Sequence, residues 1–365
     1  MCPIRHGLRV SGLRSIIRSA LAEPIPRWLF GRRWQINGLS MGSRIVSTGR
    51  ATPRTLLTNH ELEHRMDTSD EWIRTRTGIA QRYVLSTGES LVEIAAQASE
   101  IALGRAGITA DKLDAIIVGT VSSDFGFPSF ACQLQHRLGI DAIPAFDVAA
   151  ACSGFVYALS VADSAMRAGD YTRVLVVGAD ALSTMVDWDD RSTAVLFGDG
   201  AGAVVLVYEH GQRGVLGSLL RSSGACWDML SVRNRGVQNT ADAEARRLSE
   251  DAIRMKGPEL FKIAVKSLEE ITRKVADRAG VNFNDISLVV PHQANLRIIN
   301  AVAQRLGLGA DKVFTNVDRY GNTSAASVPI ALDEAIEAGR IRSNDLVMLN
   351  ACGGGLTWGA NLVRW

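Results

Sequence analysis

The sequence predicts an α/β fold composed of two duplicated halves. Three pairs of segments resemble each other: GRAGITADKLDAIIVGT and DRAGVNFNDISLVVPHQ, QHRLGIDAIPAFDV and AQRLGLGADKVFTNV, and ALSVADSAMRAGDYTRVLVVGADA and ALDEAIEAGRIRSNDLVMLNACG. The matching glycines lie 173, 168 and 170 residues apart: Gly107 and Gly280, Gly139 and Gly307, Gly169 and Gly339. Each copy alternates apolar strands with helices, so we expect two α/β halves, residues 41–210 and 211–365, related by a pseudo-twofold axis.

The first half alternates predicted strands and helices. A strand at SRIVSTG is followed by a helix that is capped near Thr58 and Asn59. Ser90 to Gly107 is a predicted helix with its apolar side chains on one face, DAIIVGTVS a strand and SFACQLQHRLG a helix. STAVLFGDGAGAVVLVYE is expected to form two strands joined by a hairpin at Gly198 to Gly202. A nucleotide-binding loop would require a helix after these glycines, and a strand follows.

The second half repeats this alternation after a long polar segment, Arg221 to Glu250. Glu259 to Gly280 is a predicted helix, SLVVPHQAN a strand, and Asn295 to Gly307 another helix. NVDRYGNTSAASVPIALDEAIEAG resembles the central unit of the first half, and LVMLNACGGGLTWGANLVRW closes the chain with two strands around three glycines.

The composition excludes several classes of protein. The chain has 365 residues, of which 47% are hydrophobic and 21% charged, as in a soluble globular protein. No apolar run reaches the roughly 18 residues of a membrane helix. The cysteines are odd in number and form no CxxC pair, which argues for a reducing compartment and against a disulfide framework or a zinc knuckle: Cys2, Cys132, Cys152, Cys226 and Cys352. We expect a cytoplasmic protein.

The N-terminal segment differs in charge from the body of the chain. Residues 1–40 carry seven arginines and one acidic residue, Glu23, a net charge of +6, which leaves −4 of the total of +2 for the remainder. A mildly acidic body is not that of a general nucleic-acid binder. Residues 1–40 are either an organelle transit peptide or in-frame codons upstream of a start at Met41; we favour the second, because MGSRIVSTG combines a start with a first strand.

Cys152 lies at a predicted strand-to-helix junction. AFDVAAA forms an apolar strand before it, and a helix with Gly169 as its C-cap follows. A thiol at a helix N-terminus is expected to have a lowered pKa, which favours the nucleophilic thiolate. The alternative is a small buried residue in a tight turn, since free cysteines are usually structural.

Two further stretches point to the same site. In the duplication, Cys152 corresponds to Asn322 at a separation of 170 residues, so both are expected at helix N-termini that converge near the pseudo-twofold axis. His292 ends a strand and is followed by polar residues. Together His292 and Asn322 supply donors for a carbonyl oxygen, and Gly353 to Gly355 allow backbone N–H groups to approach as an oxyanion hole. Cysteine proteases use a similar Cys/His/Asn set, and a metal site of Cys152, His292 and Cys352 is disfavoured by its ligand spacing.

The segment TSDEWIRTRTGIAQRYV is polar, basic and aromatic. Trp72 is followed at short spacing by Arg74 and Arg76, which is a suitable combination for stacking on a nucleotide and clamping its phosphates. The alternative is an ordinary amphipathic surface segment.

Several long strings resemble the β-ketoacyl-[acyl-carrier-protein] synthase III family: TSDEWIRTRTGI, AFDVAAACSGF, LFGDGAGA, VPHQANLRII, YGNTSAASVPIALDEA and GGGLTWG. The resemblance runs from Met41 to Trp365 and implies a thiolase-like fold with αβαβα layers. Asn322 is the discriminating residue, because the elongating synthases of this superfamily use Cys-His-His and the thiolases Cys-His-Cys.

The resemblance also implies a role for individual residues. Cys152 is the acylated nucleophile, and His292 and Asn322 bind the malonyl thioester carbonyl. The remaining implied residues form an oxyanion hole (Cys152, Gly354, Gly355), a coenzyme A site (Trp72, Arg76, Arg191), an acyl-length limit across a dimer interface (Phe127) and a carrier-protein surface (Gln293, Ala294, Asn295, Leu296, Arg297).

The implied reaction condenses acetyl-CoA with malonyl-acyl carrier protein in a homodimer that needs no metal or redox cofactor. The implied partners are acyl carrier protein, acyl-CoA and a second copy of the chain, with no nucleic acid or membrane. A primer synthase of a secondary-metabolite pathway and a degenerate, non-catalytic subunit are the alternatives. Two features depart from the family: Pro258 stands where many members have asparagine, and residues 1–40 have no counterpart.

Overall fold

The computed structural model describes residues 35–36, 39–233 and 251–365. The predicted N-terminal extension lies almost wholly outside these residues, as does the end of the polar segment that was predicted from Arg221. The first long strand is β2 (Leu39–Ala51), which therefore begins before the predicted Ser43 and passes through Met41.

The first half builds a six-stranded sheet in the order β1-β2-β8-β7-β5-β6. Its strands are β1 (Gln35–Ile36), β2, β5 (Ala115–Gly119), β6 (Ala145–Val148), β7 (Arg173–Ala181) and β8 (Asp199–His210). β5 runs parallel to both β6 and β7, whereas β8 is antiparallel to β7 and β2. β5 and most of β7 are buried on both faces, which agrees with their continuous apolar sequences.

The second half builds a four-stranded sheet in the order β12-β13-β14-β9. Its strands are β9 (Gly214–Ser222), β12 (Leu288–Pro291), β13 (Leu346–Gly353) and β14 (Thr357–Arg364). β12 is parallel to β13, and the other neighbours are antiparallel. This arrangement repeats the order and directions of β2, β8, β7 and β5, so the predicted duplication is present in the topology.

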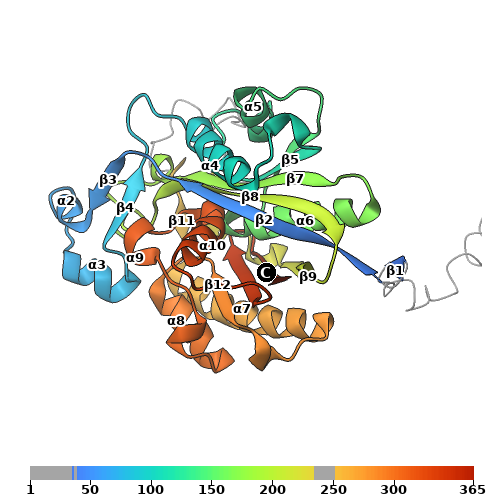
Figure 1. Cartoon of the computed structure of the whole chain (residues 1–365). Coiled ribbons are helices and arrows are strands. Elements are labelled where there is room, and N and C mark those ends of the chain that lie inside the picture. Colours follow the sequence, from blue (N-terminus) through green and yellow to red (C-terminus); the bar gives the residue numbers. More distant parts are fainter. Residues whose placement is uncertain (1–34, 37–38, 234–250) are drawn as a thin grey trace, which may run out of the picture.

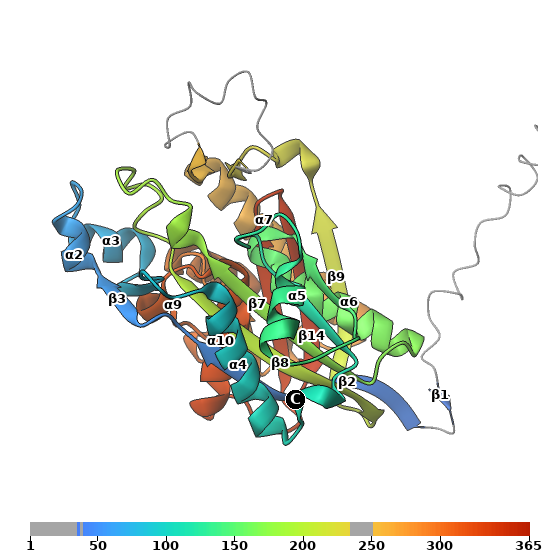
Figure 2. The same ribbon diagram turned by 90° about the horizontal axis from the view of Figure 1, so that it is seen from above.

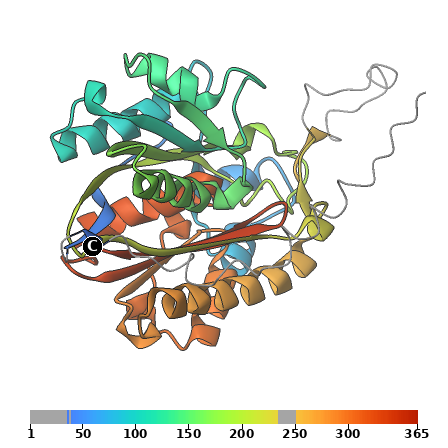
Figure 3. The same cartoon turned by 90° about the vertical axis from the view of Figure 1, so that its right-hand side faces the viewer.

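Helices form three layers around the two sheets (Figures 1 and 3). α6 (Gly154–Ala168) and α10 (Ser327–Glu337) lie between the sheets and bury their apolar side chains with both of them. α4 (Leu91–Ala106) and α5 (Phe130–Arg137) cover the outer face of the first sheet. α7 (Gly257–Ala279) and α8 (Leu296–Leu306) cover the second. The predicted αβαβα architecture is confirmed.

A small flap projects from one end of the layers (Figure 2). It contains the hairpin of β3 (Thr55–Thr58) and β4 (Gln81–Val84) with α2 (Asn59–Glu63) and α3 (Asp70–Thr77), and it contacts α9 (Val317–Tyr320). Arg82 is fully buried beneath the flap, where it donates to Asn59 Oδ1 (2.8 Å) and to the backbone oxygen of Val195 (2.7 Å). This side chain joins the flap to the segment before β8. A further short pair, β10 (Leu230–Ser231) and β11 (Arg254–Met255), packs Leu230 and Met255 against the hydrophobic cluster of the flap.

Two details of the sequence-based prediction were wrong. Gly198 to Gly202 does not form a hairpin, because residues 191–196 form turns and Asp199 already belongs to β8. The duplicated turns are also offset by three residues from the predicted pairing of Cys152 with Asn322. The 3₁₀ helices η3 (Ala151–Ser153) and η9 (Ser324–Ala326) precede α6 and α10, and each begins with a left-handed residue, Ala151 (φ 45°) and Ser324 (φ 52°). Cys152 therefore corresponds to Ala325.

Within the described ranges, no helix is long and apolar enough to cross a lipid bilayer.

Candidate active site

Cys152 sits in a turn that is held by contacts from both halves. It lies on η3, between β6 and α6. The Ser153 hydroxyl is within 2.7 Å of both the Ala150 oxygen and the Thr357 hydroxyl, and Thr357 donates to the same Ala150 oxygen. Because Thr357 begins β14, the second half helps to hold the left-handed turn that presents Cys152.

Gly353 provides the closest approach between the halves at this turn. A Cβ atom at Gly353 would lie 2.5 Å from the backbone nitrogen of Cys152, so only glycine fits there. Gly354 and Gly355 follow in the turn to β14 and are not among the residues that line the cavity beside Cys152. Their predicted part in an oxyanion hole stays a prediction.

The expectation of a lowered Cys152 pKa was wrong. Cys152 is only 4% exposed, and burial raises the pKa of its thiol to about 12. Removing a thiolate from water costs more than the end of the following helix and the nearby hydroxyl recover. Cys152 is therefore a neutral thiol in the free protein, and its proton has to leave when the sulfur attacks.

Ser324 contacts the nucleophile from the second half. Its hydroxyl lies 3.4 Å from the Cys152 sulfur, and this hydrogen bond acts to lower the thiol pKa. Ser324 opens η9, the duplicate of the turn that carries Cys152. The sequence places Ser324 in the stretch Gly321-Asn322-Thr323-Ser324, which was expected to point to the site, but it assigned no role to this residue.

His292 is a buried, neutral imidazole directly after β12. Burial lowers its pKa to about 3. In the described part of the chain, the Ser327 hydroxyl has two neighbours, His292 Nδ1 at 2.5 Å and the backbone N–H of Gln293 at 3.3 Å. The N–H can only donate, so among these described neighbours Nδ1 is the one acceptor for the Ser327 proton. We infer that Ser327 donates to Nδ1 and that the single ring proton lies on Nε2. His292 therefore acts as a hydrogen-bond donor in the site.

Asn322 is oriented by its own loop. Its backbone nitrogen donates to Leu196 (2.9 Å), its backbone oxygen accepts from Gly198 (3.1 Å), and its side-chain Oδ1 accepts from the backbone N–H of Ser324 (2.9 Å). With Oδ1 occupied, the Nδ2 amide remains for the site. Asn322 thus supplies a second neutral donor.

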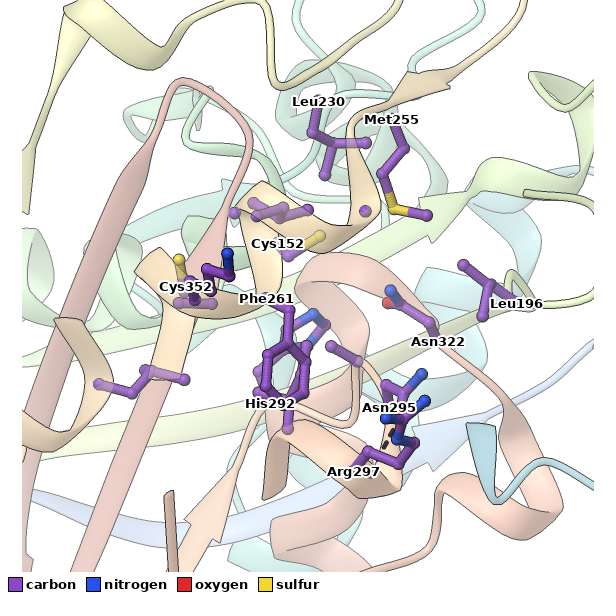
Figure 4. Close-up of a pocket in the computed structure, with 18 of the residues that line it drawn as sticks. Cys152, Leu196, Leu230, Met255, Phe261, His292, Asn295, Arg297, Asn322 and Cys352 are labelled. Atoms are coloured by element: carbon purple, nitrogen blue, oxygen red, sulfur yellow. Dashed lines mark hydrogen bonds between the residues drawn. The ribbon is translucent and has the colours of Figure 1, made fainter. Parts of the chain in front are cut away.

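One cavity of about 540 Å³ brings these groups together (Figure 4). Cys152, His292 and Asn322 all line it, as the sequence predicted. Most other lining residues are apolar and come from β10, β11, α7, α8 and the segment before α8: Leu230, Met255, Pro258, Leu260, Phe261, Ala264, Leu268, Ala294 and Ile298. Such a cavity excludes water from the thiol and strengthens the two polar donors.

Cys352 is a second buried cysteine in this cavity, which the sequence analysis did not predict as part of it except in a disfavoured metal site. It lies on β13, and burial raises the pKa of its thiol to about 12. It packs with Ala264 and Leu268 of α7. Among the described residues, no group of three or more His, Cys, Asp or Glu side chains is arranged to hold a metal ion.

The three side chains of the predicted coenzyme A site come together at the flap, which Arg191 reaches from the turn before β8, and their binding of a nucleotide stays a prediction. The guanidinium carbon of Arg76 lies 4.9 Å from the centre of the Trp72 ring, and that of Arg191 lies 5.1 Å from it. Asn295, which lines the cavity, donates to the backbone oxygen of Arg76 (3.1 Å). The clamp is therefore joined to the cavity wall through the N-terminus of α8.

The predicted carrier-protein segment divides into buried and accessible residues. Gln293 is 1% exposed, and its amide bonds to the backbone of Pro291, Phe314, Asn316 and Val317, so its prediction as a carrier contact was wrong. Leu296 packs against the flap, where its Cβ fills the space beside Gly78. Ala294, Asn295 and Arg297 line the cavity, and Arg297 is exposed.

Phe127, the predicted limit on acyl length, does not line the cavity of its own chain. It is 88% exposed and lies beside exposed Phe125 and Val121 in the loop before α5. Any contact with an acyl group would have to be made across an interface.

The fold and the site define a cysteine-dependent acyltransferase with a thiolase-like architecture. The family described as 3-oxoacyl-[acyl-carrier-protein (ACP)] synthase III matches residues 146–224, and its C-terminal domain matches residues 276–365. A β-ketoacyl-[acyl-carrier-protein] synthase III of Aquifex aeolicus is 48% identical over 89% of this chain and its own full length, and one of Desulfotalea psychrophila is 46% identical over 88% of this chain and 99% of its own. The crystal structure of the Aquifex aeolicus synthase superimposes with a TM-score of 0.83 over 89% of this chain and 100% of that chain.

The chain therefore belongs to the β-ketoacyl-[acyl-carrier-protein] synthase III family, as its motifs predicted, and is a condensing enzyme of the acyltransferase class.

Replacing His292 by asparagine tests whether the fold holds this imidazole neutral, because a neutral buried histidine makes the unfolding free energy depend on pH. A pKa of 6.5 in the unfolded chain and about 3 in the folded one means that the unfolded state binds more protons between these values. The unfolding free energy that depends on a neutral His292 is therefore complete above pH 6.5 and is lost as the pH falls toward 3. Between pH 7.5 and 5.5, the wild type should lose about 1.4 kcal/mol of unfolding free energy that His292→Asn does not lose, measured by denaturant titration.

The control is His136→Asn, which removes an exposed histidine from α5 and should leave the wild-type pH dependence unchanged. If His292→Asn and the wild type lose the same free energy over this range, His292 is not held neutral by the fold.

Proposed function

We propose that this protein condenses acetyl-CoA with malonyl-acyl carrier protein to form acetoacetyl-acyl carrier protein, carbon dioxide and coenzyme A, and so initiates type II fatty-acid synthesis. One observation carries this proposal: the buried thiol of Cys152 shares an apolar cavity with two neutral hydrogen-bond donors, His292 and Asn322. A decarboxylative condensation needs one acyl acceptor and donors for an enolate oxygen, and it has little use for a strong base.

In the first half-reaction, the Cys152 sulfur attacks the thioester carbonyl of acetyl-CoA, and coenzyme A leaves as the thiol. The tetrahedral oxygen requires backbone donors, for which the N–H groups of Cys152, Gly354 and Gly355 are the predicted source. The Trp72 ring with Arg76 and Arg191 offers a stacking surface and two cations for the nucleotide end of coenzyme A.

In the second half-reaction, the malonyl thioester carbonyl lies between His292 Nε2–H and the Asn322 amide. Loss of carbon dioxide places negative charge on that oxygen, and the two donors stabilise it. The resulting carbanion attacks the acetyl group on Cys152, and the sulfur leaves as the thiolate, which takes up a proton to restore the neutral thiol. A neutral donor suits this step, because an imidazolium would hold the ground-state carboxylate as well as the enolate.

The entrance to the cavity is suited to a phosphopantetheine arm and an acidic carrier. Met255, Phe261 and Ile298 form an apolar wall. Lys262 and Arg297 place positive charge at the lining on α7 and α8, and this charge supports contact with acyl carrier protein. Pro258 stands in the first turn of α7, where its missing N–H leaves no helix bond broken, and it offers the arm no side-chain donor.

We also propose that the protein is a homodimer. β6 is an edge strand of the first sheet, and large apolar side chains are exposed around it: Val121, Phe125, Phe127 and Phe146. A second copy would cover this patch and pair the edge. Phe127 of each copy would then enter the partner's acyl pocket and limit the primer length.

The proposed reaction uses the two substrates alone, without a metal or redox cofactor, and the proposed location is the cytoplasm. The alternative of a secondary-metabolite primer synthase differs only in the acyl group, and no feature of the cavity favours it over acetyl-CoA. The non-catalytic alternative is not favoured, because all three reacting groups are present and line one cavity.

Replacing Cys152 by alanine should abolish covalent labelling by radiolabelled acetyl-CoA. The matched control is Cys352→Ala, which removes the other buried thiol of the same cavity and should leave labelling in place. Labelling is measured as acetyl groups per chain and located by peptide mass. Full labelling of Cys152→Ala at Cys352 or at another residue would show that Cys152 is not the nucleophile.

Reversing the charge of Arg297 should impair use of the carrier substrate selectively. In Arg297→Glu we expect the KM for malonyl-acyl carrier protein to rise about tenfold at low salt, with little change for acetyl-CoA. The control is Arg342→Glu, an exposed arginine in the connection between α10 and β13. Equal losses for both substrates, or an effect that salt does not diminish, would contradict a carrier surface here.

Replacing Phe127 by alanine should extend the accepted primer by a few carbons, because a smaller side chain opens the end of the acyl pocket. The measurement is product mass from a panel of acyl-CoA primers with malonyl-acyl carrier protein, and the control is Phe125→Ala. Sedimentation of the wild type should give about twice the chain mass of 39.3 kDa. A monomeric wild type, or one that already prefers eight-carbon primers, would contradict the proposed limit.

A further inference from the structure

The proton of Cys152 needs an acceptor during the first half-reaction. The thiol is neutral and buried, so its ionisation cannot precede substrate binding at neutral pH. His292 cannot receive this proton on the nitrogen that remains for the cavity, because Nε2 already carries hydrogen and Nδ1 is bonded to Ser327. Another group must therefore accept the proton that leaves the Cys152 sulfur.

Ser324 is the start of such a route. Its hydroxyl contacts the Cys152 sulfur at 3.4 Å, and it also hydrogen-bonds to the carboxyl group of Asp180. A serine hydroxyl has one donor and two acceptor positions. It can therefore accept a proton from the sulfur while it passes its own proton to the carboxyl group.

Asp180 is a fully buried carboxyl group at the end of β7. Its Oδ1 accepts from the Val121 backbone and from the Thr120 and Ser122 hydroxyls, and its Oδ2 accepts from the backbone N–H of Ala325 (3.1 Å). All of these described partners are neutral. A buried carboxylate without a cation is held by hydrogen bonds alone, and it gains from taking up a proton.

Two titratable groups face Asp180 from neighbouring elements. Cys152 on η3 lies beyond Ser324, and Asp199 at the start of β8 interacts with Asp180 by charge. Burial raises the pKa of Asp180 above that of an exposed carboxyl. The charge of Asp180 in turn raises the pKa of Asp199 and of the Cys152 thiol.

We propose that Ser324 is a catalytic residue that relays the Cys152 proton to Asp180, which acts as a positioning residue and temporary proton store. The S–H bond breaks as the Ser324 oxygen takes this proton, the Ser324 O–H bond breaks as the Asp180 carboxylate takes the other, and the sulfur electron pair forms the bond to the acetyl carbon. When the tetrahedral adduct collapses, the proton returns through Ser324 to the departing coenzyme A sulfur. The Cys152 proton therefore ends on coenzyme A, and Ser324 and Asp180 return to their starting protonation states.

This inference rests on the proposed acylation of Cys152, and the two half-reactions separate it from that function. Ser324→Ala should slow acetylation of Cys152 about 10²-fold at pH 7, because a positioned proton acceptor contributes at least this much. The deficit should shrink about tenfold per pH unit as direct ionisation of the thiol replaces the relay. A merely structural defect would give a deficit that is independent of pH.

In the decarboxylation step we expect the reverse: little effect of the Ser324 substitution and a large effect of the His292 substitution. On enzyme that has been acetylated in advance, Ser324→Ala should release carbon dioxide from malonyl-acyl carrier protein within about threefold of the wild type. His292→Ala should lose about 10²–10³ in this step, because it removes an enolate donor. Acetyl-enzyme is followed by protein mass and decarboxylation by carbon dioxide release.

Ser164→Ala is the matched control, since it removes a hydroxyl from α6 that bonds only within its helix among the described contacts, and it should acetylate at the wild-type rate. Asp180→Asn, checked for folding by circular dichroism, should reproduce the pH-dependent deficit. If Ser324→Ala acetylates like the wild type, or if its deficit does not change with pH, the relay is wrong. A folded Asp180→Asn variant with normal acetylation also contradicts the relay. If this variant does not fold, the result for Ser324→Ala alone tests the relay. A wild type that no acyl-CoA acylates would instead refute the proposed function.

Discussion

The close contact between the two duplicated turns is the constraint on which the site depends. η3 and η9 each begin with a left-handed residue, and each is packed against backbone of the opposite half. A Cβ at Gly353 would come within 2.5 Å of the Cys152 nitrogen, and one at Gly178 within 2.3 Å of the Ala325 oxygen. Side chains at either glycine would separate the halves, so this spacing brings Ser324 to the Cys152 sulfur.

Burial then decides the charge state of the site. The same packing that brings the turns together removes Cys152, His292 and Asp180 from water. Without solvent, Cys152 and His292 are held in their neutral forms, because the thiol pKa rises to about 12 and the imidazole pKa falls to about 3. Burial also raises the pKa of the Asp180 carboxylate, which makes it a better proton acceptor. The result is a set of neutral donors and a thiol, which suits the binding of an enolate and requires a directed path for one proton.

The flap connects substrate binding to this centre through buried polar contacts. Arg82 bonds the flap to Val195, and the next residue, Leu196, accepts the backbone N–H of Asn322. On the other side, Asn295 bonds the flap helix α3 at Arg76 to the start of α8. The nucleotide clamp and the enolate donors are therefore carried by adjoining segments, although they are far apart in the sequence.

The sequence by itself determined the duplication, the αβαβα fold and the identity of Cys152, His292 and Asn322, because periodicity and long motif strings are local properties of the chain. It also predicted Trp72 and the arginines around it. The tertiary structure alone decided which side chains are buried. Gln293 belongs to the same motif as Arg297, yet its amide is buried and hydrogen-bonded to the protein backbone. Cys352 and Ser324 join the site because two distant turns meet, and Phe127 faces outward. The pKa of Cys152 rises rather than falls for the same reason: a helix end can be predicted from sequence, but the loss of water around the sulfur depends on packing between the two halves.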